Sequence, residues 1–397
     1  MVTEKYEVSC IEREEDWRTI EGDWKRLVRE SERATLFSDW EWTRTWWEVF
    51  SSSAHRLRII VVSAAGRVVG IVPLYTLSTT LVEGLVVVRV LRLLGTGEVA
   101  EDEVSTEYGD IIASPGLEEE VARESVSFIF GALGREWDMA VFDNVLERAA
   151  IVKYLVPTAV RLGGLSAALP IGRRYFVELP ENWNTYLGAL SKRTRSNLLA
   201  AQRRMARQAC ASIELHSGGA EVLEAFDRLA VLHSRRWRER GKAGAFASAR
   251  FVHFHRCLLN RPQGPCQIWA RLWILTIDKQ DVAAVYALEQ HNQLHIYQTG
   301  IDPHNYKYLS PGLLLLCEAL SWSIGRRLRV FDLMLSKSTD YKAKFSLNTA
   351  GMSRALVFNN SIKGLGVYVA WRIRRGCGRI LGAAKGFYER RTGTAEL

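Results

Sequence analysis

The sequence lacks the features that mark several classes of protein. Its six cysteines are scattered and none belongs to a CxxC pair, which argues against a zinc site or a disulfide framework and favours a reducing compartment. No apolar run approaches the ~20 residues that cross a bilayer. The opening residues, MVTEKYEVSC, include acids and no apolar core. We therefore expect no secretory signal and a cytoplasmic protein.

Common catalytic signatures are also missing. No GxxxxGKS, GxxxxGKT, HExxH, GxSxG or GxGxxG motif occurs in a usable context, so P-loop, zinc-protease and hydrolase chemistry lack support and no metal is expected. What remains is an ordinary globular composition, with 48% apolar and 24% charged residues. A chain of 397 residues is too long for one compact core and suggests two domains.

The charge is strongly basic and unevenly distributed. A net charge of +9 suits nucleic acid, a membrane surface or an anionic cofactor as a partner. Basic residues concentrate at Lys192–Arg207 and beyond Lys363, whereas acidic residues concentrate at Glu98–Asp110. Thirteen tryptophans predict large apolar walls or grooves. Trp40 follows a helix cap, and packing is the more frequent role of such a residue.

Strand and helix patterns intermix along the whole chain, which predicts an α+β (mixed α/β) fold. A hairpin, a further strand, a helix and another strand follow one another in each half. We expect residues 1–179 and 180–360 to form two similar domains, followed by a tail at 361–397. The expected strands lie at 57–64, 68–75, 85–94, 110–113, 138–142, 175–179, 268–277, 282–290, 295–301 and 329–335. The main expected helices lie at 116–133, 146–155, 187–205, 226–237 and 250–259, with one more beginning at 311.

The first candidate site is the start of the helix that follows the strand at 295–301. Ser310-Pro311-Gly312 opens this helix, and proline suits the first turn because its missing N–H would have no partner there. The next free N–H groups lie at the positive end of the helix dipole and suit an anion such as a pyrophosphate. The alternative is an ordinary helix cap.

Downstream of this helix, a carboxylate and several cations come close together in the sequence. Asp332 lies inside an apolar strand, where it needs a partner. The loop that follows contains Lys337, Tyr341, Lys342 and Lys344. Asp332 is therefore either a catalytic carboxylate or the acidic member of a structural salt bridge with one of these lysines.

Two further segments have alternative interpretations. The basic segment Lys192–Arg207, which includes Arg193 and Arg195, is either a phosphate-binding face or a solvated helix face. At the end of the acidic segment, Glu107 and Asp110 flank Tyr108 and either meet a cationic amine or cap and turn the backbone. His233 lies on an apolar helical stripe, which favours a core histidine over a catalytic one.

The tail combines apolar and basic residues at helical spacing. One stripe is surrounded by arginines and lysines, so the segment either packs on the body or lies on an anionic bilayer, which would make the protein peripheral to the inner face of the membrane. The stripe consists of Val369, Ile373, Cys377, Ile380, Ala384 and Phe387.

Several short motifs occur in a characteristic order. They are Phe37-Ser38-Asp39-Trp40 with Trp46-Trp47, Leu190 to Arg195, Leu232-His233 with Trp237 through Gly241, Gly300-Ile301-Asp302, Ser310-Pro311-Gly312 and Asp340-Tyr341-Lys342. With this set the chain resembles, from about residue 17 to about residue 345, the CelD-like (cellulose-biosynthesis-associated) acyltransferases of the GNAT superfamily. That family is similar to the Fem-type aminoacyltransferases.

The resemblance implies two tandem GNAT-like domains, each a mixed sheet flanked by helices, with an acyl-CoA site in the second. It implies an N-acyltransferase whose acceptor amine attacks the thioester directly, the acceptor being an amino sugar, an amino acid or a lipid-like amine. Where the family carries a glycine before Tyr-Lys, this chain has Ser336–Asp340 without one and with an added lysine. The catalytic residues expected are Asp332, Tyr341, Lys342 and Asp110. Acyl-CoA is expected at Gln298, Thr299, Gly300, Ser310, Gly312, Leu313, Arg193 and Arg195, and the acceptor at Trp40, Tyr108 and Lys337.

Two other functions stay open. A tRNA-dependent, Fem-like aminoacyltransferase would use the Lys192–Arg207 face for phosphates, although no long coiled-coil arm is evident in the sequence. A non-catalytic component of a membrane-associated polysaccharide or lipid assembly would rely on the tail.

Overall fold

The structure is a computed structural model that describes residues 5–81, 86–208, 210–261, 268–336 and 341–375. Its described strands form a small sheet, in the order β1-β3-β4-β7, and a large one, in the order β10-β11-β12-β13-β14-β9-β15-β8-β6-β5-β2. The strands of the small sheet are β1 (Tyr6–Ile11), β3 (Ile59–Ala64), β4 (Arg67–Val72) and β7 (Ile112–Ala113). Those of the large sheet are β2 (His55–Leu57), β5 (Leu74–Leu81), β6 (Val86–Leu93), β8 (Met139–Leu146), β9 (Leu165–Glu178), β10 (Ala211–His216), β11 (Trp269–Ile277), β12 (Gln280–Gln290), β13 (Gln293–Ile301), β14 (Val330–Ser336) and β15 (Asn348–Phe358).

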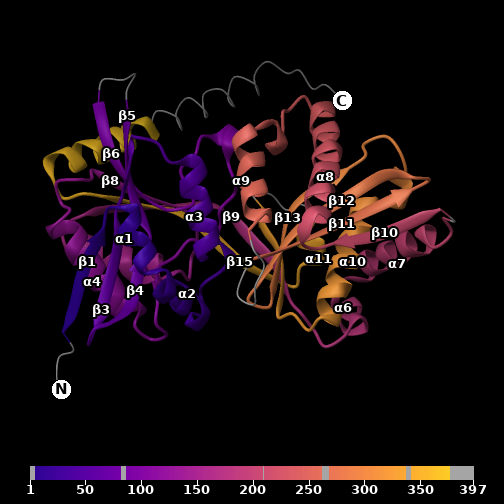
Figure 1. The fold of residues 1–397 in the computed structure, drawn as a ribbon, viewed down its shortest axis with the longest axis horizontal. Helices are drawn as coiled ribbons and strands as arrows, with labels where there is room; N and C mark the ends of the chain where they lie inside the picture. Colours follow the sequence, from indigo (N-terminus) through magenta and orange to yellow (C-terminus); the bar gives the residue numbers. More distant parts are fainter. Residues whose placement is uncertain (1–4, 82–85, 209, 262–267, 337–340, 376–397) are drawn as a thin grey trace, which may run out of the picture.

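Helices cover both faces of the large sheet, so the predicted mixed α/β fold is confirmed (Figure 1). In the second half, alternate residues of β11 point to opposite faces. Leu272 and Ile274 lie in the core beneath α8, whereas Trp273 and Leu275 lie in the core beneath α10. The helices are α1 (Glu14–Thr19), α2 (Glu21–Glu30), α3 (Trp40–Phe50), α4 (Glu118–Gly131), α5 (Val156–Arg161), α6 (Trp183–Ala189), α7 (Lys192–Met205), α8 (Gly219–Glu239), α9 (Ala249–Leu259), α10 (Pro311–Gly325) and α11 (Lys342–Phe345).

Two long strands join the halves by crossing between them. β9, from the first half, lies between β14 and β15, and β15, from the end of the second half, lies between β9 and β8. The strand predicted at 175–179 therefore begins much earlier, at Leu165. Pro170 and Gly172 are unfavourable inside a regular strand, but here they flank the point at which the pairing with β15 shifts register. A bulge tolerates both residue types.

The halves share one local arrangement that bears on function. β6 and β8 pair in parallel over only three residue pairs, and β13 and β14 do the same. Within the described residues, the two strands of each pair are not paired with each other beyond these residues. A helix connects the two strands in each case, α4 in the first half and α10 in the second. A long helix was predicted at 187–205, but Leu190 is extended and the Ser191 side chain accepts the N–H of Thr194, which starts α7 as a separate helix.

Much of the tryptophan content packs in the first half. Trp40 lies 5.5 Å from Trp17 and 5.6 Å from Trp24 between ring centroids, and all three are buried. Packing, the alternative favoured from the sequence, therefore accounts for Trp40. Among the described residues, no helix is both long and apolar enough to span a bilayer.

Candidate active site

The opening between β13 and β14 defines the candidate site. These strands pair from Gln293 with Val330 to His295 with Asp332, although both continue further. In β13, Tyr286 pairs with Gln298 but Ala287 pairs with Ile296, so Tyr297 is an extra residue. Such a bulge reverses the facing of the residues that follow it. Thr299 therefore points to the α10 side of the sheet, the side on which the cavity lies.

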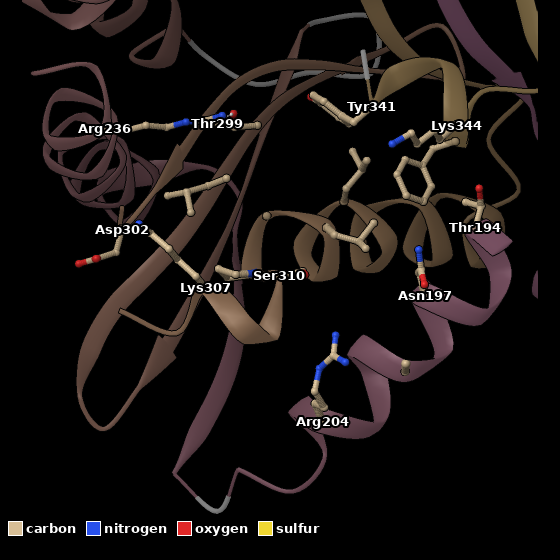
Figure 2. Close-up of a pocket in the computed structure, with 17 residues that line it drawn as sticks. Thr194, Asn197, Arg204, Arg236, Thr299, Asp302, Lys307, Ser310, Tyr341 and Lys344 are labelled. Carbon is tan, nitrogen blue, oxygen red and sulfur yellow. Dashed lines mark hydrogen bonds between the residues drawn. The ribbon is translucent and has the colours of Figure 1, made fainter. Parts of the chain in front are cut away.

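A cavity of about 550 Å³ extends from this opening, a volume typical of ligand pockets. Its wall combines the end of β13, the start of α10, one face of α7, Arg236 of α8 and the segment around α11 (Figure 2). On α7 the lining residues recur at helical spacing, and Arg204 points from that helix towards α10. The polar lining residues are Thr194, Asn197, Arg204, Arg236, Thr299, Asp302, Lys307, Ser310, Tyr341 and Lys344.

The cavity carries an excess of positive charge. Arg204, Arg236, Lys307 and Lys344 line it, and within the described part of the chain none of them forms an ion pair with a carboxylate. The acidic lining residue, Asp302, accepts hydrogen bonds from two backbone N–H groups and lies 3.9 Å from Arg235 outside the cavity. Uncompensated cations around a concave wall attract an anionic ligand.

The start of α10 offers fewer free backbone N–H groups to an anion than the sequence predicted. Ser310 is left-handed, with φ 55°, and its carbonyl accepts the N–H groups of both Leu313 and Leu314. The N–H of Leu313, one of the groups expected to be free in the first turn, is thus engaged. A Cβ at position 312 would lie 2.4 Å from the terminal Cδ1 atom of Ile301 on β13, so that side chain would have to move.

The predicted cofactor residues divide into two groups. Thr299, Ser310, Gly312 and Leu313 line the cavity. The lining residues do not include Gln298, Gly300, Arg193 or Arg195. A Cβ on Gly300 would lie 2.7 Å from Cβ of Leu232 on α8, so glycine lets β13 approach that helix closely.

Among the arginines of α7, the lining residue is Arg204. Arg193 is exposed, and Arg195 donates to the carbonyl of Leu187. The signal in the sequence that could have identified Arg204 was its helical spacing from Thr194 and Asn197, which also line the cavity. The sequence showed this spacing without showing which face of the helix meets the cavity.

Asp332 is completely buried in an ion pair with an arginine. Arg174 of β9 approaches its Oδ2 atom at 2.8 Å, and Nδ1 of His295 lies 3.2 Å from the same atom. The Tyr108 hydroxyl donates to Oδ1 at 3.2 Å. Burial favours a raised pKa for Asp332, but the Arg174 charge and His295 outweigh it and hold the pKa below the usual range. The salt bridge anticipated from the sequence exists, although its cation is Arg174 and not a lysine.

Asp110 caps a helical turn. Its carboxylate accepts the N–H groups of Ala150 and Ile151, together with that of Ile111. Burial raises the pKa of Asp110 to about 6, against the opposing effect of these hydrogen bonds. The capping alternative raised from the sequence therefore describes its contacts.

Glu107 is the acidic residue that lies next to the strand opening. Its Oε2 atom accepts the N–H of Leu335, on β14 beyond the paired region, at 2.9 Å. Burial, and next the charge of Asp332, raise the pKa of Glu107 to about 7. Its carboxyl group therefore contacts β14 beyond the point at which β14 pairs with β13.

The remaining predicted residues lie around this opening or outside the described part. Nζ of Lys342 donates to the Leu335 carbonyl at 2.8 Å, so Lys342 and Glu107 bind the two backbone groups of the same residue. Tyr341 lines the cavity with 44% of its surface exposed. Lys337 lies outside the described residues. Among the residues described, no group of His, Cys, Asp or Glu side chains could hold a metal ion.

The second part of the acidic segment, residues 104–110, is mostly buried and contacts both halves. Tyr108 donates its N–H to the Asn144 carbonyl, and the Asn144 side chain donates to the Thr106 carbonyl. The segment therefore lies against β8 where β8 separates from β6. The Tyr297 hydroxyl of β13 donates to the Val104 carbonyl. The first half thus places its own chain, and Glu107 with it, against the opening of the second half.

Family comparison covers this region of the chain. Residues 192–343 match the family model described as the acetyltransferase (GNAT) domain. This part of the chain carries a GNAT acetyltransferase domain. It includes α7, β13 and α10, which contribute to the wall of the cavity, and β14. A search of the curated proteins found no match.

Two solved structures share the fold of most of this chain. FemX is 9% identical, with 84% of this chain and 95% of FemX covered at a TM-score of 0.55. The C-terminal domain of a proposed lysylphosphatidylglycerol synthetase from Agrobacterium fabrum is 12% identical, with 89% and 95% covered at a TM-score of 0.50. At such identities the likeness concerns the fold alone.

Proposed function

We propose that the protein is a CoA-dependent N-acyltransferase that moves an acyl group from acyl-CoA to an amine. The observation that carries this proposal is the cavity beside the end of β13, lined by four cations that form no ion pair with a carboxylate of the described residues. Most of its wall lies within the residues that match the GNAT domain. The resemblance to CelD-like acyltransferases supports the same reaction. The acceptor class is an amino sugar, an amino acid or a lipid-like amine.

The cations fit the phosphates of CoA. Arg204, Arg236 and Lys307 come from three elements around the start of α10 and would hold the pyrophosphate. The thioester would lie near Thr299, where the edge of β13 facing β14 is not paired with that strand in the described residues. Backbone N–H groups on such an edge stabilise the oxyanion of a tetrahedral intermediate.

In this proposal the acceptor amine attacks the thioester carbonyl carbon with its lone pair. The carboxylate of Glu107 takes the proton that the nitrogen loses, which a group with a pKa of about 7 does well near neutral pH. The C–S bond breaks, and Tyr341 returns a proton to the leaving thiolate. Lys342 holds the carbonyl of Leu335, the residue whose N–H Glu107 accepts. Asp332, already paired with Arg174, positions this region and is not the base.

The test is free-thiol release from a panel of acyl-CoAs of different chain length, with candidate amines present. Arg204→Ala should weaken CoA binding by about tenfold, the loss expected for one hydrogen bond to a charged group. Arg193→Ala, on the exposed side of the same helix, is the matched control and should bind CoA as the unmodified protein does. No CoA binding, or equal losses in both variants, would contradict the proposal.

A tRNA-dependent aminoacyl transfer is the second candidate. It is favoured by exposed basic residues of the α7 region outside the cavity, at Lys192, Arg193, Arg203 and Arg207. Binding of aminoacyl-tRNA would then fall steeply with salt and would weaken in Arg193→Ala. The two variants therefore distinguish the donors. If neither acyl-CoA nor aminoacyl-tRNA binds, the result favours the third function, a non-catalytic role in a membrane-associated assembly.

A further inference from the structure

Residues 362–375 form a helix fixed to the outside of the first half (Figure 1). Val367, Tyr368 and Trp371 pack against apolar residues of β6, β8 and β15. The Lys363 ammonium lies 3.0 Å from the buried Asp138 carboxylate. The beginning of the predicted tail therefore docks on the body with one face of the helix. This docking fixes which residues lie on the opposite face.

That opposite face is apolar. Ile362, Leu365, Val369 and Ile373 are 94%, 51%, 46% and 60% exposed. Their spacing of three, four and four residues places them in one line along the helix. Single exposed apolar residues are ordinary, but an aligned set marks an interaction surface. Val369 and Ile373 are the described members of the stripe predicted from the sequence, whose remaining residues lie beyond the described part.

The charges around the stripe identify the partner. Residues 362–375 contain four basic residues and no acidic one. Arg372 and Arg375 lie over the rings of the docked Tyr368 and Trp371, at 6.0 and 5.4 Å, which holds two cations on one side of the stripe. Helical spacing places Arg374 on the other side. A second copy of the same face would bring like charges together, which opposes self-association. A convex apolar line between cations instead matches a bilayer, which needs no complementary cavity.

We propose that the exposed face of residues 362–375 binds the surface of an anionic phospholipid bilayer. Ile362, Leu365, Val369 and Ile373 enter the boundary between headgroups and acyl chains, and the flanking arginines meet lipid phosphates. The protein would then be held with the outer side of the β6–β8 region against the membrane. This inference is independent of the proposed acyl transfer.

The test is sedimentation of the full chain with vesicles. Binding is expected to vesicles of phosphatidylcholine plus phosphatidylglycerol, to be weak with phosphatidylcholine alone, and to fall with salt. The double variant Val369→Glu/Ile373→Glu should lose at least tenfold in partition coefficient. Val231→Glu, at a residue of α8 that is also about half exposed, is the matched control and should bind normally.

Three results would overturn the proposal. They are no binding to anionic vesicles, undiminished binding of the double variant, and a dimer in light scattering that the double variant dissociates. The last would assign the face to a second copy. Because both residues are exposed, unchanged melting temperatures should accompany the loss of binding, and acyl-CoA binding should be retained.

Discussion

Replacing Glu107 with glutamine is expected to stabilise the protein increasingly as the pH rises. Burial, and next the Asp332 charge, raise the pKa of Glu107 from 4.5 to about 7. Between these values the native state holds more protons than the unfolded state, so stability present at low pH is lost as the pH rises through about 7. A rise of about 2.5 units corresponds to roughly 3 kcal/mol.

Glutamine keeps an acceptor for the Leu335 N–H and removes the charge. The difference in unfolding free energy between the variant and the unmodified protein should therefore grow by about 2–3 kcal/mol from about pH 5 to about pH 9. Urea unfolding across this range measures it, with exposed Glu119→Gln as the control. A difference that stays constant with pH would refute the raised pKa.

The same variant tests the proposed chemistry separately. Loss of the base should lower turnover by roughly 10²- to 10⁴-fold and remove the pH dependence near pH 7. Retained turnover would exclude Glu107 as the base, while the stability result would stand by itself.

Two further substitutions test the packing around the site. Arg174→Met should destabilise the protein by about 3–5 kcal/mol, because Asp332 would stay buried without its cation. In urea unfolding, the double variant Arg174→Met/Asp332→Leu should recover most of this loss. If it recovers none, the burial of an unpaired charge is not the cause. Gly300→Ala should cost about 1–3 kcal/mol, because the new Cβ presses on Leu232. Gly188→Ala, where nothing lies within 4 Å, should not lower the melting temperature, and equal effects of the two alanines would contradict this reasoning.

Local patterns in the sequence predicted many of the elements, although not the strands β1, β10 and β15. The strands predicted at 268–277, 282–290 and 295–301 are β11 (Trp269–Ile277), β12 (Gln280–Gln290) and β13 (Gln293–Ile301), and α10 begins at Pro311 as expected. Hydrophobic periodicity and helix caps involve residues a few positions apart, so they can be read along the chain. His233 is buried with its pKa lowered to about 4, mainly by burial, as its apolar stripe indicated.

The tertiary structure alone decided which charged residues meet. Asp332 pairs with Arg174, and Glu107 contacts Leu335, across separations of 158 and 228 residues. Periodicity carries no information about such pairs, because they depend on β9 and β15 crossing between the halves. Burial, which sets the pKa of Glu107, exists only once both halves exclude water from it. The sequence could therefore locate the helix start beside the cavity, but not which arginine of α7 lines the cavity or which carboxylate contacts β14.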